Sequence, residues 1–145
     1  MGVILILFKT RARLVMKREP MPHKILIVED EPNIVVPLQF LMERNGYRVS
    51  VASTGEDAIS SILSFIPDLI LLDITLPGID GFEVCQAVRN IPEQQHTKII
   101  FLSAMGRDMD IAKGMAIGGD AYITKPFSNA DVVTKVRDLL NDKNK

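Results

Sequence analysis

The stretch from Asp68 to Gly81, DLILLDITLPGIDG, constrains the fold more than any other part of the chain. Its apolar run, Leu69–Leu72, does not alternate between apolar and polar residues, which is typical of a strand buried on both faces of a parallel sheet. Asp73 comes directly after this run, and a proline and two glycines come after Asp73. The pattern predicts a carboxylate where a buried strand leaves the sheet, although aspartate is also common there as a plain turn residue.

The remainder of the chain alternates between apolar strands and amphipathic helices. We predict strands at residues 24–28, 47–52, 69–72, 98–102 and 121–124. We predict helices at residues 33–44, 54–66, 80–91, 107–117 and 128–140. Each parallel connection has to cross over through a helix, so the alternation indicates an α/β fold with a parallel sheet covered on both sides.

Two of these helices contain residues that weaken a helix. Pro37 lies in the first, and we predict that Asn33 caps this helix, so that the missing N–H falls near the first turn. Gly114 interrupts the helix at 107–117, and two glycines come after that helix. We therefore expect that helix to be the least stable of the set.

Residues 1–22 differ from the rest of the chain, because an apolar run at 3–8 is succeeded by basic residues and prolines. The run is far below the ~20 residues of a membrane span, and its charges lie on the wrong side for a secretory signal. We assign residues 1–22 as an N-terminal extension, 23–141 as one domain and 142–145 as a C-terminal tail. The extension belongs to an upstream start or an added segment, or else forms a weak tether to an anionic surface.

Charge and cysteine content exclude some classes of function. The formal net charge of −1 gives no overall attraction to nucleic acid. The single cysteine, Cys85, cannot form an internal disulfide, and its place in a predicted helix favours a small core residue over a nucleophile.

Polar residues stand at the ends of four predicted strands. They are Glu29 and Asp30 after the first, Asp73 after the third, Ser103 after the fourth and Lys125 after the fifth. Ligands of parallel α/β sheets bind beyond these strand ends, so we expect the side chains to lie together.

This set of side chains has a defined chemistry. Three neighbouring carboxylates repel one another without a counter-charge, and their hard oxygens suit Mg²⁺. A lysine, a hydroxyl and a metal around a carboxylate nucleophile would stabilise phosphoryl transfer and give an aspartyl phosphate.

Four segments, IVEDEP, LLDITLPGIDG, FLSA and AYITKPF, resemble in order and spacing the receiver domain of bacterial two-component response regulators. The resemblance covers Lys24 to about Leu140. It implies the flavodoxin-like, doubly wound (βα)5 fold of chemotaxis receivers, with five parallel strands in the order 2-1-3-4-5.

The resemblance also implies site roles. Asp73 would be the phosphoacceptor and a Mg²⁺ ligand, together with Asp30 and the backbone carbonyl of Thr75, and Glu29 would be an acid behind these ligands. Lys125 would bind the phosphoryl oxygens, and its bond to the next residue, a proline, would be cis.

A second pair would transmit the signal. Ser103 would bind the phosphoryl group, and Tyr122 would be the switch aromatic that turns inward when Ser103 moves. A half-buried strand aromatic without a switch role is the alternative for Tyr122.

The implied function is a stand-alone, Mg²⁺-dependent switch phosphorylated by a sensor histidine kinase or a histidine phosphotransfer protein. We expect it to promote its own phosphorylation and dephosphorylation without being a turnover enzyme. We also expect a cytoplasmic location, no contact with membrane or nucleic acid, a downstream protein target on residues 107–140, and a monomer or phosphorylation-dependent dimer.

Two alternatives come from other classes. The chain could be the receiver portion of a larger, for example DNA-binding, regulator. It could also be an enzyme with a nucleotide or flavin cofactor, but neither GxGxxG after the first strand nor GxxxxGK[ST] is present.

Overall fold

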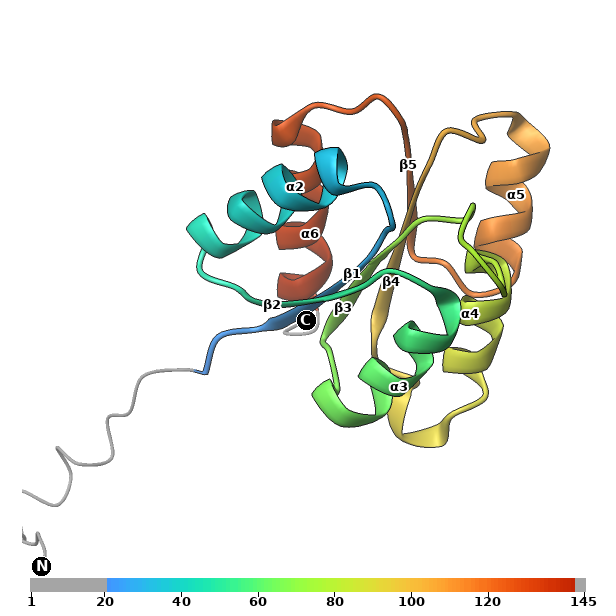
Figure 1. The fold of residues 1–145 in the computed structure, drawn as a ribbon, viewed down its shortest axis with the longest axis horizontal. Helices are drawn as coiled ribbons and strands as arrows, with labels where there is room; N and C mark the ends of the chain where they lie inside the picture. Colours follow the sequence, from blue (N-terminus) through green and yellow to red (C-terminus); the bar gives the residue numbers. More distant parts are fainter. Residues whose placement is uncertain (1–20, 143–145) are drawn as a thin grey trace, which may run out of the picture.

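Five parallel strands form a single sheet in the order β2-β1-β3-β4-β5 in the computed structural model, which describes residues 21–142 (Figure 1). The strands are β1 Lys24–Val28, β2 Arg48–Ala52, β3 Leu69–Leu72, β4 Lys98–Ser103 and β5 Ala121–Thr124. The helices are α2 Pro32–Arg44, α3 Gly55–Phe65, α4 Gly81–Arg89, α5 Asp108–Ala116 and α6 Asn129–Asp142, with a short 3-10 turn, η1, at Pro92–Gln94. The predicted flavodoxin-like α/β fold and strand order are confirmed.

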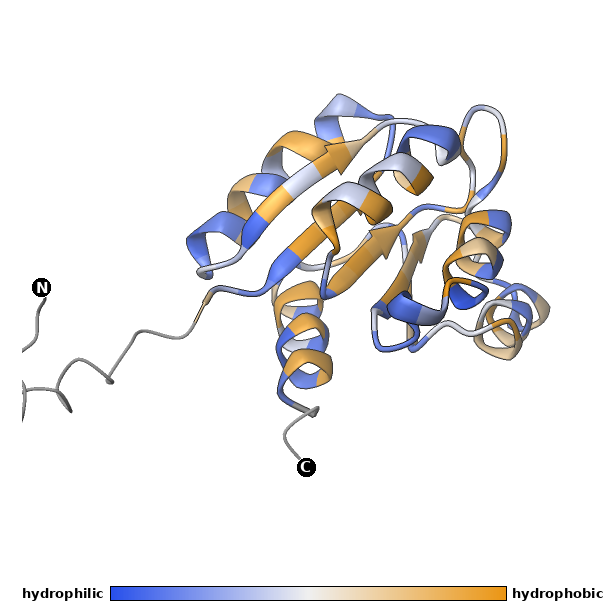
Figure 2. Ribbon diagram, turned by 90° about the horizontal axis from the view of Figure 1, so that it is seen from below, coloured by the Kyte–Doolittle hydropathy of each residue, from blue (hydrophilic) through white to orange (hydrophobic). Residues whose placement is uncertain are grey.

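The helices cover both faces of the sheet. Helices α2 and α6 lie on one face, and α3, α4 and α5 lie on the other (Figure 1). Every residue of β3 is buried, and its residues pack alternately into two separate apolar cores. Figure 2 shows the strands as an apolar layer between the amphipathic helices. Burial on both sides explains why Leu69–Leu72 shows no polar alternation.

The strand register brings the carboxyl ends together. Val28 of β1 pairs with Leu72 of β3, and Leu72 pairs with Phe101 of β4. Ser103, the last residue of β4, pairs with Thr124 of β5. The residues just beyond these positions therefore emerge side by side at one edge of the sheet.

The predicted start of the first helix is wrong. The N-cap is Glu31 rather than Asn33, and Pro32 occupies the first turn. The Glu31 carbonyl accepts the N–H groups of Ile34 and Val35, at 2.9 Å each, which sets this earlier start. Pro37 consequently lies in the second turn, where its missing N–H removes a regular helical hydrogen bond.

Gly114 lies inside α5 without ending it, and packing accounts for the glycine. A Cβ at this position would lie 3.0 Å from the Phe101 ring and 3.3 Å from the Tyr122 ring. The glycine therefore lets α5 approach β4 and β5 closely. The low local stability expected for this helix stays a prediction.

Cys85 is fully buried in α4, as predicted for a core residue. Burial raises the pKa of its thiol to about 11.

None of the helices within residues 21–142 combines the length and the apolar character needed to span a bilayer. The interpretations of residues 1–20 and 143–145 fall outside the described residues, and the boundaries 1–22, 23–141 and 142–145 stay a prediction.

Candidate functional site

The predicted acidic cluster forms at the carboxyl edge of the sheet. Glu29, Asp30 and Asp73 each place one carboxylate oxygen within 4.8 Å of the others. The backbone holds two of them in position, because Glu29 N–H donates to Ala52 O and Asp73 N–H donates to Val28 O, both at 3.0 Å. Glu29 and Asp73 are buried, whereas Asp30 is exposed.

Lys125 brings the counter-charge into this cluster. Its ammonium donates to Glu29 Oε1 at 2.8 Å and to Asp73 Oδ2 at 3.3 Å, and Glu31 Oε1 lies 4.0 Å away. The Lys125 N–H donates to Ser103 O at 2.8 Å, which extends the β4–β5 pairing by one residue. The Lys125–Pro126 bond is cis, as the resemblance implied. One partly buried cation is thus shared by three acids.

The ionisation of this group depends on its burial. Burial raises the pKa of Glu29, and the neighbouring Asp73 charge raises it further, against the opposing effect of Lys125. Burial opposes the charge on Lys125, but the hydrogen bond to Glu29 and the charges of Asp73 and Glu29 outweigh it and raise the pKa of Lys125. Lys125 is therefore a stable cation, and it lies beside the Glu29 carboxylate, whose charged form is disfavoured by burial.

The segment after β3 folds back tightly over Asp73. Thr75 N–H donates to Asp73 Oδ1 at 3.3 Å, and Gly81 N–H donates to Ile74 O at 2.8 Å. A Cβ at Gly81 would lie 2.2 Å from the Asp73 carbonyl oxygen, so only glycine fits at this return point. A capping box between Asp80 and Glu83 starts α4 there. Thr75 is thereby kept beside the phosphoacceptor candidate.

A hollow opens above these groups. It is lined by Asp30, Glu31, Asp73, Thr75, Ala104 and Lys125. The sequence pattern did not assign Glu31 or Ala104 to the site. Both could have been predicted from the sequence, because Glu31 directly follows Asp30 and Ala104 directly follows Ser103.

Ser103 does not belong to the residues that line the hollow. Its side chain is fully buried, and its Oγ accepts a hydrogen bond from Met105 N–H at 3.2 Å. The Tyr122 hydroxyl donates to the carbonyl of the same Met105. Met105 therefore joins the two predicted switch residues through its backbone.

Tyr122 also continues a row of aromatic rings into the core. Its ring centroid lies 5.8 Å from that of Phe101, which lies 5.6 Å from that of Phe82. Burial raises the pKa of Tyr122. The half-buried position agrees with both interpretations of Tyr122, so its switch role stays a prediction.

The donor set fits Mg²⁺. Lys125 engages Glu29 at short distance, whereas Asp30 is exposed at the hollow and Asp73 lines it. Hard carboxylate oxygens at an open position, where waters can complete an octahedron, are what this ion requires. Asp30, Asp73 and the backbone of Thr75 are the groups able to hold it.

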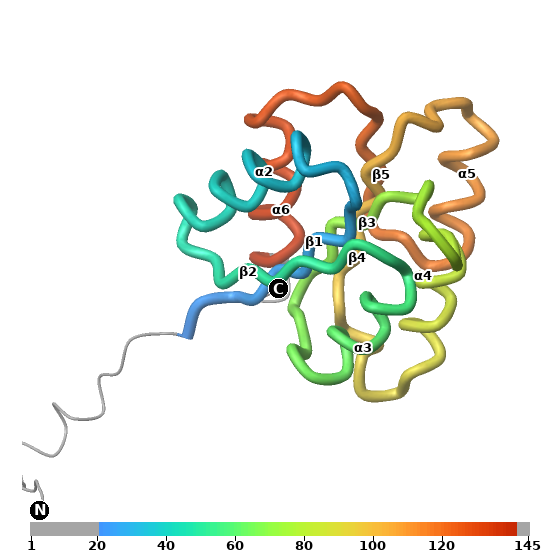
Figure 3. Tube along the Cα trace, in the orientation of Figure 1, coloured from blue at the N-terminus to red at the C-terminus, as the bar shows by residue number. Residues whose placement is uncertain are grey.

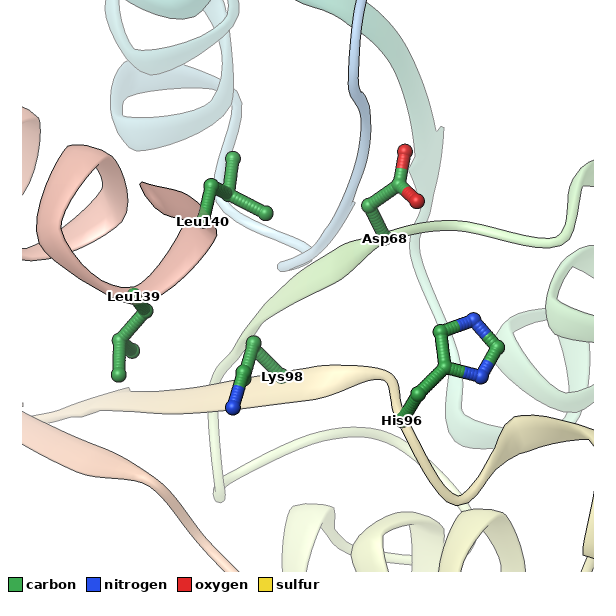
Figure 4. Close-up of a pocket in the computed structure, with 5 residues that line it drawn as sticks. All are labelled: Asp68, His96, Lys98, Leu139 and Leu140. Carbon is green, nitrogen blue, oxygen red and sulfur yellow. The ribbon is translucent and has the colours of Figure 1, made fainter. Parts of the chain in front are cut away.

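A second hollow lies at the opposite edge of the sheet. It is lined by Asp68, His96, Lys98, Leu139 and Leu140 (Figure 4). Asp68 is used there by the backbone, because its Oδ2 accepts the N–H of Lys24 at 2.8 Å and ties the starts of β1 and β3 together. The length of β3 separates this hollow from Asp73, so it takes no part in the site.

A family model described as "Response regulator receiver domain" matches residues 25–137. The alkaline phosphatase synthesis transcriptional regulatory protein PhoP of Bacillus subtilis is 42% identical over 120 residues, covering 83% of this chain and 49% of PhoP. The phosphate regulon transcriptional regulatory protein PhoB of Rhizobium meliloti is 37% identical over 117 residues, covering 81% of this chain and 52% of PhoB. The chain thus spans about half the length of these curated relatives.

A solved structure agrees with these relatives. The crystal structure of a CheY-like response regulator receiver domain protein from Methanospirillum hungatei superimposes with a TM-score of 0.80 at 27% identity. The match covers 85% of this chain and 97% of that one.

Proposed function

The chain belongs to the response regulator receiver domain family of two-component systems, and we propose that it is a switch controlled by phosphorylation of Asp73. The observation that supports this role most is the setting of the Asp73 carboxylate. It is nearly buried at a strand end, 3.3 Å from the Lys125 ammonium, and it faces an open hollow. A carboxylate so placed can act as a nucleophile toward an anionic phosphoryl group.

The proposed reaction is transfer from a phosphohistidine. One oxygen of the Asp73 carboxylate attacks phosphorus and forms an O–P bond as the P–N bond of the donor breaks. The electron pair stays on the leaving imidazole nitrogen, which takes up a proton. Hydrolysis by water later breaks the O–P bond, releases inorganic phosphate and regenerates the carboxylate.

The residues around Asp73 have distinct roles in this proposal. Lys125 neutralises the phosphoryl oxygens, for which it exchanges part of its contact with Glu29 and Asp73. Asp30, Asp73 and the Thr75 carbonyl would hold Mg²⁺, with Glu29 as an additional nearby acid, and the ion would help to neutralise the charge of the transferring group.

Phosphorylation would change the contacts of Ser103. Its hydroxyl now accepts from Met105 N–H, and a phosphoryl group on Asp73 would offer it a charged acceptor. Movement of Ser103 would release Met105, to which the Tyr122 hydroxyl is bonded. The two arrangements would then differ at α5 and β5, the kind of two-state element that a modification biases.

Two kinds of partner belong to the proposal. A sensor histidine kinase or a histidine phosphotransfer protein donates the phosphoryl group, and a downstream protein reads residues 107–140. We retain the cytoplasmic location, the absence of turnover, and a monomer or phosphorylation-dependent dimer as predictions.

A second candidate is the receiver portion of a DNA-binding regulator. The relatives are named transcriptional regulatory proteins, and the chain spans about half their length. Immunoblotting of the native gene product measures its mass. A product about twice the mass of this chain would favour this candidate over a stand-alone receiver.

The direct test uses acetyl phosphate and Mg²⁺ with intact-mass spectrometry. We expect the wild type to gain the mass of one phosphoryl group, and Asp73→Asn to gain none. Asp68→Asn, an aspartate at the other end of the same strand, is the matched control and should be labelled as the wild type is. Labelling that persists in Asp73→Asn would refute the assignment.

A further inference from the structure

Arg89 makes a dense set of polar contacts that the proposed site does not use. It lies in the last turn of α4, and its side chain is 20% exposed. The guanidinium donates to Gly118 O from Nε at 3.0 Å and from Nη2 at 2.8 Å, and to Thr97 O from Nη1 at 2.7 Å. It also donates to Asp120 Oδ2 at 3.0 Å. Arg89 therefore ties α4 to the segments before β4 and after α5.

Two of the residues that accept from Arg89, Gly118 and Asp120, come just after the carboxyl end of α5. Gly118 comes after the C-cap residue Ile117, and Gly119 N–H donates back to Gly114 O at 2.9 Å. A guanidinium at the carbonyl end of a helix also interacts favourably with the helix dipole. The carboxyl end of α5 is thus held by its own backbone hydrogen bond and by the Arg89 guanidinium of α4. Figure 3 shows α4 and α5 next to each other.

Backbone geometry at Gly118 is fitted to this arginine. Gly118 has φ +120°, and a Cβ there would lie 2.8 Å from Arg89 Cγ and 2.9 Å from Nε. Asp120 completes the joint, because its Oδ2 also accepts Ile99 N–H at 2.8 Å and its own N–H donates to Ile99 O at 2.8 Å. The loop after α5 is therefore fixed to both Arg89 and β4.

The amino end of α5 is held differently. Arg107, at the N-cap, has a side chain that is 72% exposed, and its ion pair with Asp110 is internal to the helix. Within the described residues, the hydrogen bonds that join 104–110 to neighbouring segments run from Met105 to Ser103 and to Tyr122. Both of these partners are the proposed switch residues.

We propose that Arg89 is a positioning residue that fixes the carboxyl end of α5, so that phosphorylation at Asp73 displaces only the amino end. The helix pivots about the Arg89–Gly118 joint, and the change at Ser103 and Tyr122 becomes a swing of residues 104–110. The phosphorylation part of this proposal rests on the proposed function. The fixed end is a property of the unphosphorylated chain.

Hydrogen-exchange mass spectrometry of the full chain tests the proposal, with and without acetyl phosphate and Mg²⁺. In the wild type, phosphorylation should change exchange at 104–110 and leave 116–120 unchanged. In Arg89→Ala, exchange at 116–120 should rise about tenfold without any donor, because several hydrogen bonds to a charged group are lost. The same residues should then respond to phosphorylation.

Controls separate a positioning role from a general loss of stability. Exchange at 69–72 in the central strand should not change in Arg89→Ala. Arg107→Ala, the matched arginine at the other end of α5, should leave 116–120 unchanged. Arg89→Lys should restore only part of the protection, because one ammonium cannot serve the whole set of acceptors. If Arg89→Ala does not fold, Asp120→Asn weakens the same joint while keeping an oxygen acceptor for Ile99.

Three results would overturn the proposal: an equal response of 116–120 and 104–110 in the wild type, unchanged exchange at 116–120 in the variant, or faster exchange throughout the domain. If acetyl phosphate adds no phosphoryl mass, the proposed function and the swing fail together. The comparison of unphosphorylated Arg89→Ala with wild type then still decides whether Arg89 fixes the helix end.

Discussion

Lys125 and Glu29 form a partly buried ion pair, with 2.8 Å between Nζ and Oε1, at side-chain exposures of 14% and 2%. The cation that is expected to meet a phosphoryl group is thus already held by an acid that is not the phosphoacceptor. This arrangement keeps Lys125 in place before phosphorylation. It also makes both residues important for stability.

Replacing Lys125 by methionine should lower the free energy of unfolding by about 3 kcal/mol, because two buried carboxylates lose their counter-charge. Urea denaturation in a chelator at neutral pH measures the loss. Lys135→Met, on α6 away from the site, is the control. A loss no larger than that of the control would mean that the ion pair does not stabilise the fold.

The stability should depend on pH through Glu29. Its pKa is raised in the folded chain, so folding favours the protonated form. The stability that this contributes is present below the unfolded pKa of about 4.3 and is lost as pH rises through the folded value. The unfolding free energy of the wild type relative to Glu29→Gln should therefore fall as pH increases across that window.

Urea denaturation of both proteins without metal gives this difference, over a range from about pH 4, near the unperturbed carboxyl pKa, to about pH 8. A difference that stays constant with pH would contradict the raised pKa of Glu29.

Lys125 titrates in the alkaline range instead. Its raised pKa implies stability that persists below the unfolded value and is lost as pH rises through the folded one.

Removing the Tyr122 hydroxyl should weaken the connection to Met105. Tyr122→Phe should lose about 1 kcal/mol of unfolding free energy, the usual net worth of one hydrogen bond, and still accept a phosphoryl group. The change in hydrogen exchange at 104–110 on phosphorylation should shrink. Tyr47→Phe is the control. An unchanged exchange response in Tyr122→Phe would indicate that Tyr122 is a half-buried strand aromatic without a switch role.

A methyl group at Gly114 should destabilise the domain. Alanine improves the helix propensity by about 1 kcal/mol, but the added Cβ presses on the fully buried Phe101 ring, and overpacking of this kind costs about 1–3 kcal/mol. We expect a net loss in thermal denaturation. Met115→Ala, at an exposed residue of α5, is the control for a substitution to alanine in the same helix. A stabilised Gly114→Ala would show that α5 can move away at little cost.

The sequence pattern was sufficient for the strands and for most of the site. Buried strands have no polar face, so Leu69–Leu72 could be recognised, and the residue after each strand had to lie at the shared edge. This reasoning alone placed Asp73, Glu29 and Lys125 together. The contacts of each side chain were not predictable in the same way, because Ser103 is buried and accepts a hydrogen bond from Met105 N–H instead of lining the hollow.

Features set by contacts between distant segments were missed or misread. The glycine at 114 looks like a helix breaker in sequence, whereas its contacts with Phe101 and Tyr122 show close packing. Arg89 looks like an ordinary basic residue at a helix end, and two of its acceptors, in Gly118 and Asp120, lie 29 and 31 positions away. The start of α2 was misplaced because Asn33 is a favoured cap, whereas Pro32 fits the first turn and set the boundary.

The most direct test of the central claim locates the phosphoryl group chemically. The full chain is incubated with acetyl phosphate and Mg²⁺, the acyl phosphate is reduced with borohydride to homoserine, and the modified residue is identified by peptide sequencing in the mass spectrometer. We predict homoserine at position 73, dependent on Mg²⁺. Modification at another acid, or none at position 73, would contradict the assignment of Asp73 as the phosphoacceptor.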